Sequence, residues 1–196
     1  MNEIKRVILC GHDASGKDHL ASDLIQVGFK FPISYTTRPP RKGEIEGVHY
    51  RFTTSEHFKE MIAADKMYEH VLYEDRGVNE DEDWYYGRTR EDFPTGNLMI
   101  MTPAGLVQLS EQDRKESFII FIDIDEAIRR ERMDEREDAD DTERRLRTDR
   151  EDFENFTNYD YKITNPNFIS SNIQMMLERN IGLNSTTRNN KTNKTV

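Results

Sequence analysis

The chain has 196 residues, a net charge of −10 at pH 7 and a hydrophobic content of 35%. This length suits one domain with a sizeable core, and the acidic charge argues against a protein that coats the DNA backbone, so we expect no nucleic-acid partner. The single cysteine, Cys10, excludes a disulfide framework and indicates a reducing compartment. No segment approaches the roughly 18 apolar residues of a membrane span, and the N-terminus does not resemble a signal peptide. We therefore expect a cytoplasmic protein without membrane contact.

A glycine-containing loop follows the first predicted strand. The apolar run Val7–Cys10 leads into Gly11-His12-Asp13-Ala14-Ser15-Gly16-Lys17-Asp18, and a helix is predicted over 17–27. Glycines in such a loop let backbone N–H groups turn toward a polyphosphate, and the helix N-terminus adds partial positive charge. We predict an ATP-binding P-loop in which Lys17 reaches the β- and γ-phosphates. The residues expected to bind ATP are Gly11, Ala14, Ser15, Gly16, Lys17, Asp18 and His19.

Asp18 stands where a P-loop normally carries Ser or Thr, whose hydroxyl binds Mg²⁺. A carboxylate is also a magnesium ligand, but it brings negative charge close to the triphosphate. Two interpretations remain. Asp18 is the protein ligand of Mg²⁺, which we favour, or it only caps the following helix.

The rest of the chain alternates apolar runs with helical segments. Strands are predicted at 31–34, 98–101, 118–122 and 161–163, and helices at 103–109, 126–133, 142–156 and 167–178. Continuous apolar strands separated by helices indicate a parallel sheet covered on both faces, so the predicted fold is a three-layer α/β/α core. Residues 182–196 have almost nothing to bury and are predicted to form a disordered polar tail.

Residues 34–90 break this pattern and are predicted to form an inserted, mainly β lobe. They hold most of the tyrosines, with one predicted helix at 55–64 and strand-like pieces near 48–52, 67–73 and 84–86. At the start of the lobe, Arg38 and Arg41 lie in a proline-stiffened loop and carry guanidinium groups suited to a phosphate. On the residues alone, a phosphate site and a solvated charged loop both remain open.

Several of these segments together resemble the guanylate kinase family. The resemblance rests on segments that occur in the same order as in the family: Ser34–Gly43, Gly47–Phe52, Met67–His70, Tyr85–Gly87, an arginine-rich helix, and Tyr159–Asn165. It covers roughly residues 4–180. It implies one guanylate-kinase-like domain over 1–181, with a nucleoside-monophosphate (NMP) lobe at about 34–90 and a mobile helical lid at about 132–142.

The resemblance implies an ATP-dependent, Mg²⁺-requiring kinase of GMP or dGMP, acting as a monomer or homodimer. The residues that it assigns to NMP binding are Ser34, Arg38, Arg41, Tyr50, Glu69, Tyr86 and Thr102. Arg38, Arg41 and Tyr50 would hold the acceptor phosphate with help from Tyr86. Ser34 and Glu69 would read the base, because a carboxylate can accept from both the N1–H and the 2-amino group of guanine. Adenine lacks both donors there.

Arginines recur in and after the segment 128–136. Arg132 and Arg136 are one helical turn apart, and Arg145 follows an acidic stretch. Because acidic residues alternate with these arginines, the pattern alone fits a solvated helix with i,i+4 ion pairs. The resemblance implies instead that Lys17, Arg132, Arg136 and Arg145 are catalytic, neutralising the charge of the transferring phosphate. Arg129 and Arg130 are expected at the surface or near the adenine.

The chain departs from the family pattern at the base site. The family's strand before the short helix usually ends in two aspartates, one of which helps to read guanine, but Ile100 and Thr102 stand there. Arg88 replaces a small hydroxyl residue, and either a phosphate contact or a solvent-facing side chain is expected for it. Weaker guanine recognition follows from Ile100 and Thr102. The alternatives are a kinase with shifted base specificity, for a pyrimidine or modified deoxynucleotide as a virus uses, and a non-catalytic guanylate-kinase-like binding module.

Overall fold

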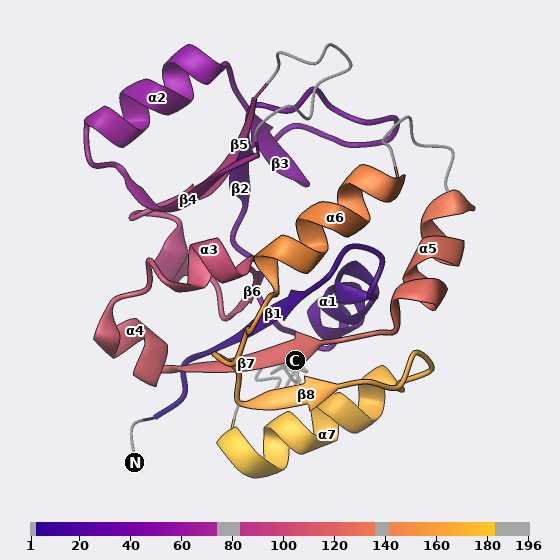
Figure 1. Cartoon of the computed structure of the whole chain (residues 1–196). Coiled ribbons are helices and arrows are strands. Elements are labelled where there is room, and N and C mark those ends of the chain that lie inside the picture. The colour runs from indigo at the N-terminus through magenta and orange to yellow at the C-terminus, as the bar shows by residue number, and fades with distance from the viewer. Residues whose placement is uncertain (1–2, 74–82, 136–141, 183–196) are drawn as a thin grey trace, which may run out of the picture.

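The computed structural model describes residues 3–73, 83–135 and 142–182. Its lower half in Figure 1 is built on a four-stranded sheet in the order β6-β1-β7-β8, in which all neighbouring strands are parallel. The strands are β1 (Arg6–Gly11), β6 (Leu98–Ile100), β7 (Ser117–Ile122) and β8 (Tyr161–Ile163). The predicted parallel sheet is therefore confirmed.

Hydrophobic side chains leave both faces of this sheet. Val7 and Leu9 of β1 point to one face, where helices α1 (Lys17–Gln26) and α7 (Ser170–Ile181) cover them. Because side chains alternate along a strand, Ile8 and Cys10 point to the other face. There they pack with helix α3 (Pro103–Leu106) and with aromatic residues that follow helix α6 (Thr142–Asp152). The three-layer α/β/α arrangement predicted from the sequence is observed.

A second, smaller sheet forms the upper lobe of Figure 1. Its order is β3-β2-β5-β4, with β2 parallel to β3 and antiparallel to β5, and β4 antiparallel to β5. The strands are β2 (Ser34–Thr36), β3 (Tyr50–Phe52), β4 (Met67–Tyr73) and β5 (Trp84–Thr89). Helix α2 (Ser55–Ala63) packs Phe58 and Met61 against this sheet. The lobe is mainly β, as its sequence indicates.

Several predicted elements differ in extent. The strand expected at 31–34 is wrong, because residues 29–33 form no strand and β2 begins at Ser34 in the lobe sheet. Pro32 lacks the N–H that a ladder requires, which explains why the chain crosses between sheets here. Helix α6 ends at Asp152, four residues earlier than predicted. The remaining described elements are the 3₁₀ turn η1 (Phe93–Thr95), the short helix α4 (Glu111–Lys115) and the helix α5 (Glu126–Asp134).

Parts of two predicted segments lie outside the described residues. These are residues 136–141 of the expected lid and residues 183–196 of the expected tail. Helix α7 ends at Ile181 and is capped by Gly182, whose positive φ of 63° suits glycine at a helix C-terminus. Across the described residues, no helix combines the length and the apolar character needed to cross a bilayer.

Candidate active site

The P-loop connects the end of β1 to the start of α1. Gly11 ends β1, and a Cβ atom there would lie 2.5 Å from the Ile122 carbonyl oxygen of β7, so the close approach of these strands requires glycine. Gly16 caps α1 with a φ of 101°, a conformation that L-residues with side chains rarely adopt. The loop therefore turns sharply into the helix and directs the N-terminal N–H groups of α1 toward the space above the sheet.

Lys17 lies over this loop. Its Nζ donates to the carbonyl oxygens of Gly11, at 2.7 Å, and of His12, at 2.6 Å. Asp18 and His19 follow in the first turn of α1 and are exposed. Ser15 is fully buried, and its hydroxyl has no hydrogen-bond partner among the described residues. The Ser15 hydroxyl is therefore not exposed to a ligand.

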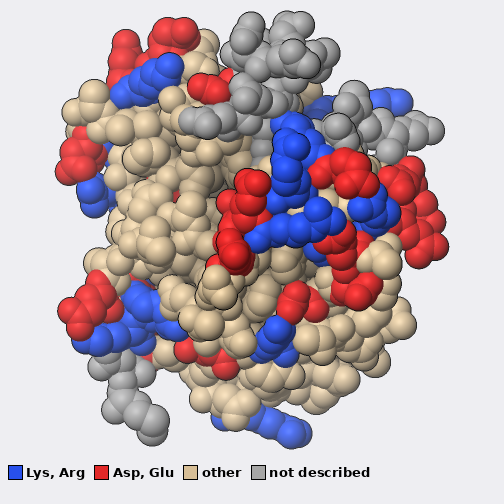
Figure 2. Space-filling view, viewed as in Figure 1, with Lys and Arg blue, Asp and Glu red and all other residues tan. Residues whose placement is uncertain are grey.

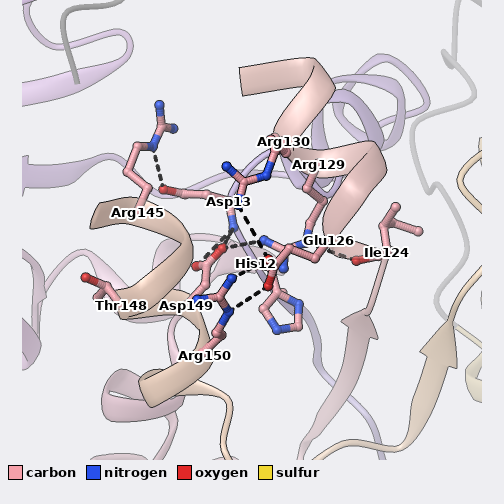
Figure 3. Close-up of polar contacts among 12 residues, drawn as sticks. His12, Asp13, Ile124, Glu126, Arg129, Arg130, Arg145, Thr148, Asp149 and Arg150 are labelled. Atoms are coloured by element: carbon pink, nitrogen blue, oxygen red, sulfur yellow. Dashed lines mark hydrogen bonds and ion pairs between the residues drawn. The ribbon is translucent and has the colours of Figure 1, made fainter. Parts of the chain in front are cut away.

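Behind the P-loop, Asp149 of α6 joins the loop to two helices (Figure 3). Its carboxylate accepts the Asp13 backbone N–H at 2.9 Å and a guanidinium N–H of Arg129, on α5, at 2.6 Å. Burial raises the pKa of Asp149 to about 6, and the Asp13 carboxylate adds to the shift while Arg129 opposes it. Burial, together with Arg129, lowers the pKa of His12 to about 4. This cluster ties the P-loop backbone at Asp13 to helices α5 and α6.

Two of the three arginines predicted to be catalytic lie in the described part of the chain, and their environments differ. Arg145 of α6 donates from Nε to the Asp13 carboxylate at 3.0 Å, which ties it to the P-loop (Figure 3). Arg132 donates to the carbonyl oxygens of Ala14, at 3.0 Å, and Pro166, at 3.1 Å. Arg136 lies outside the described residues.

Arg129 and Arg130, although adjacent in sequence, also differ in burial. Arg129 was expected at the surface or near the adenine, but it is only 3% exposed and paired with Asp149, so that expectation is wrong. Arg130 pairs with Glu126 and Glu143 on the surface, as expected. Figure 2 shows arginines and carboxylates interleaved on the face where α5 and α6 lie. Among these helical arginines, sequence periodicity alone does not distinguish the buried one from its solvated neighbours.

On the lobe side, Arg38 organises the phosphate end of the cleft. It is 4% exposed, donates to the Tyr86 hydroxyl oxygen at 3.1 Å, and pairs with Glu44 at 2.8 Å. Although burial disfavours its charge, the hydrogen bond to Glu44 raises the pKa of Arg38. Burial raises the pKa of Tyr50 to about 12, so its phenol stays a proton donor at neutral pH. Arg41 is exposed, and its backbone N–H donates to Glu44 at 2.7 Å.

At the other end of the lobe face, Glu69 of β4 is 4% exposed and pairs with Arg88 of β5 at 2.6 Å. Arg88 therefore does not face solvent, and that one of the two expectations stated for it is wrong. Ser34 is nearly buried at the start of β2. Thr102 caps α3, its hydroxyl oxygen accepting the Gly105 N–H at 3.2 Å.

One cleft of about 1390 Å³ joins the P-loop to the lobe. Six of the seven predicted ATP-binding residues line it, the exception being Ser15, and so do all seven predicted NMP-binding residues. Arg132 and Arg145 line it as well. A single small-molecule site is typically about 300–1,000 Å³, so the cleft is large enough for two ligands.

Carboxylates line the cleft beside the cations. Arg38, Arg88 and Arg145 each pair with one: Glu44, Glu69 and Asp13 respectively. Sequence reasoning gave Glu69 a role in reading the base but gave no role to Glu44 or Asp13. Asp149 was also missed, although its i,i+4 spacing from Arg145 places both on one face of α6.

Asp18 fits a magnesium ion that is shared with substrate phosphates. Mg²⁺ usually keeps several waters and takes only one or two protein carboxylates beside phosphate oxygens. The described residues contain no group of three or more His, Cys, Asp or Glu side chains able to hold a metal by themselves. Asp18 is an exposed carboxylate that lines the cleft beside Lys17, which is the donor set that such a shared ion needs.

Comparisons with known proteins agree with this geometry. The guanylate kinase family model matches residues 3–180. Over 175 residues the chain is 31% identical to the guanylate kinase of Koribacter versatilis, covering 82% of this chain and 71% of that protein. Over 87 residues it is 41% identical to the guanylate kinase of a Synechococcus species, covering 43% of this chain and 36% of that protein.

A solved structure shares the fold. The crystal structure of guanylate kinase from Anaplasma phagocytophilum matches with a TM-score of 0.65 and 21% identity, over 91% of this chain and 87% of that one. The family match covers most of the chain, and the P-loop lies between β1 and α1, where it lines the cleft. The chain belongs to the guanylate kinase family and is a kinase.

Proposed function

We propose that this kinase transfers the γ-phosphate of ATP to GMP or dGMP, with Mg²⁺ bound by Asp18 and the triphosphate. The observation that carries the proposal is that P-loop cations and lobe phosphate donors face one cleft. Lys17 and Arg132 line it from the core, and Arg38, Arg41 and Tyr50 line it from the lobe. Phosphoryl transfer chiefly requires that the donor and acceptor phosphates are held facing each other and that the negative charge between them is neutralised.

The acceptor phosphate would bind where Arg38 and the tyrosines converge. Arg38 donates to the oxygen of the Tyr86 hydroxyl, so the proton of that hydroxyl remains available to a phosphate oxygen. Tyr50 is protonated at neutral pH, as a tyrosine ordinarily is, and supplies a second neutral donor. These groups hold and orient the acceptor without removing a proton from it.

The donor phosphates would bind over the P-loop. Lys17 leaves the carbonyls of Gly11 and His12 for the β- and γ-phosphates, and the N–H groups at the start of α1 point at the same oxygens. When bound, Mg²⁺ supplies further neutralisation of the phosphate charge. Arg132 and Arg145 reach the loop from α5 and α6, so closure of these helices would add positive charge and exclude water.

ADP release measured against all common ribo- and deoxynucleoside monophosphates tests the proposal directly. Turnover is expected with GMP and dGMP, and the absence of turnover with every acceptor would overturn the enzymatic assignment. A pyrimidine monophosphate preferred tenfold or more would replace guanine with the shifted base specificity considered above.

The Arg41→Ala variant tests the acceptor phosphate site. Because the Arg41 side chain is exposed and its one described bond to Glu44 comes from the backbone, its truncation should leave the fold intact. We expect a KM for GMP about tenfold or more above wild type, the loss of one charge-assisted hydrogen bond. Lys42→Ala is the matched control, since this neighbouring cation is exposed and does not line the cleft. An unchanged KM in Arg41→Ala would place Arg41 in solvent.

A further inference from the structure

Glu69 and Arg88 face each other directly across two strands of the lobe. They are register partners in the antiparallel pair of β4 and β5, so their side chains leave the same face of the sheet. Each residue is only 4% exposed, and Arg88 Nη1 donates to Glu69 Oε1 at 2.6 Å. Arg88 Nη2 also donates to the Ile100 carbonyl oxygen at 2.8 Å. The guanidinium is therefore fixed at two points inside the base end of the cleft.

This pair changes what Glu69 can offer a base. A carboxylate that reads both the ring N–H and the 2-amino group of guanine uses both of its oxygens as acceptors, and here Oε1 already carries a guanidinium N–H. No aspartate supplies the missing acceptor, because Ile100 and Thr102 stand at the two positions where the family usually carries aspartates. The Thr102 hydroxyl oxygen is itself occupied by the Gly105 N–H. The site is left with one free carboxylate edge.

Arg88 in turn brings a donor that is not used. Its Nε is buried and has no hydrogen-bond partner among the described residues, although Arg88 lines the cleft. A buried donor without a partner is costly, so an acceptor supplied by a ligand would be favourable at this point. The base end of the cleft thus presents an acceptor, Glu69, beside a donor, Arg88.

We propose that Arg88 determines base specificity: with Glu69 it reads the ring N–H and the neighbouring carbonyl oxygen of a 6-oxopurine, and it makes the 2-amino group dispensable. This proposal rests on the proposed nucleoside-monophosphate site. Glu69 accepts from N1–H while Arg88 donates to O6. Hypoxanthine offers the same two groups as guanine, whereas adenine offers an acceptor at N1 and a donor at N6, the reverse pattern.

The test compares GMP with IMP, which differ only in the 2-amino group. In wild type we expect kcat/KM for the two to agree within about tenfold. In R88S both oxygens of Glu69 become free for guanine, so the ratio of GMP to IMP should rise at least tenfold, the effect of one hydrogen bond to a charged group. R90S is the matched control. Arg90 lies two residues further along the chain, where it pairs with Asp65 at the surface, and R90S should leave the ratio unchanged.

Binding without ATP separates this inference from the proposed function. Trp84, the single tryptophan, lines the same cleft, so its fluorescence can report the Kd of each nucleotide. If neither is turned over but both bind, the kinase assignment fails and the Kd ratio decides the role of Arg88. A wild-type preference for GMP above tenfold would overturn the proposal, and this result does not depend on R88S folding. An unchanged ratio in folded R88S would overturn it equally.

Discussion

The Asp149→Asn variant should be markedly less stable than wild type. Asp149 and Arg129 have side chains that are 10% and 3% exposed, and they bond at 2.6 Å. Asparagine keeps the size of the side chain but leaves the Arg129 charge buried without a counter-charge. Breaking a buried pair in this way typically costs about 3–5 kcal/mol. Since Tm changes by about 2–4 °C per kcal/mol in a protein of this size, we expect a Tm lower by about 6–20 °C.

Urea denaturation followed by circular dichroism gives the free energy of unfolding. Glu126→Gln is the matched control, because Glu126 pairs with Arg150 on the surface, where the side chains are 35% and 54% exposed. Such a pair contributes about 1 kcal/mol or less. If Asp149→Asn cost no more than Glu126→Gln, the reasoning about burial would be refuted.

A double variant tests whether the loss of stability in Asp149→Asn comes from the unpaired charge of Arg129. Burial and the Asp13 carboxylate together raise the pKa of Asp149 despite the attraction of Arg129. Replacing a buried ion pair by apolar residues is often neutral or stabilising. Replacing both partners with apolar residues, as in Asp149→Leu with Arg129→Met, should therefore recover most of the stability lost in Asp149→Asn. A double variant no more stable than the single one would show that Asp149 acts chiefly through the Asp13 N–H.

Three further predictions concern the P-loop. Lys17→Ala should lower kcat more than tenfold without loss of folded protein by circular dichroism, because its charge acts on the transferring phosphate; more than a tenth of wild-type kcat would contradict the assignment. Asp18→Ala should reduce activity more than Asp18→Ser and should raise the Mg²⁺ concentration needed for half-maximal rate, whereas equal small effects would leave only a helix-capping role. His12→Gln should remove part of the loss of folding stability at acidic pH. Because the pKa of His12 is lower in the folded protein, the unfolded state takes up a proton at a higher pH than the folded state does. The free energy of unfolding of wild type should therefore be highest above pH 6.5 and should fall by up to about 3 kcal/mol as the pH drops to 4. Parallel pH profiles of unfolding free energy for wild type and His12→Gln would exclude that role.

The sequence predicted the core better than the contacts at the site. Continuous apolar runs such as Val7–Cys10 are buried on both faces, and this pattern has few alternatives to a covered parallel strand. The strand predicted at 31–34 failed because Pro32 interrupts the apolar run, and the strand begins only at Ser34, in the lobe sheet. Helix α4 was missed because five residues capped by Ser110 are too short for a periodic pattern.

The partners of charged residues were the least predictable feature. Arg129 lies on a helix in which six of the nine positions are charged, so only the fold shows that it meets Asp149 inside the protein. The pairing of Glu69 with Arg88 depends on the register of β4 and β5, and 19 positions separate the two residues in sequence. The segment between those strands carries no short turn motif from which a register could be read.

The pairing of cleft arginines with carboxylates makes ligand binding an exchange reaction. At the proposed sites, a phosphate that bound Arg38 would take the place of Glu44, and one that bound Arg145 would take the place of Asp13. The number of ion pairs is then nearly the same before and after, so the affinity reflects a difference between two similar interactions. Each displaced carboxylate stays close by and competes for its arginine again once transfer is complete. Competition from these carboxylates would lower the affinity of the enzyme for its product, which favours rapid product release.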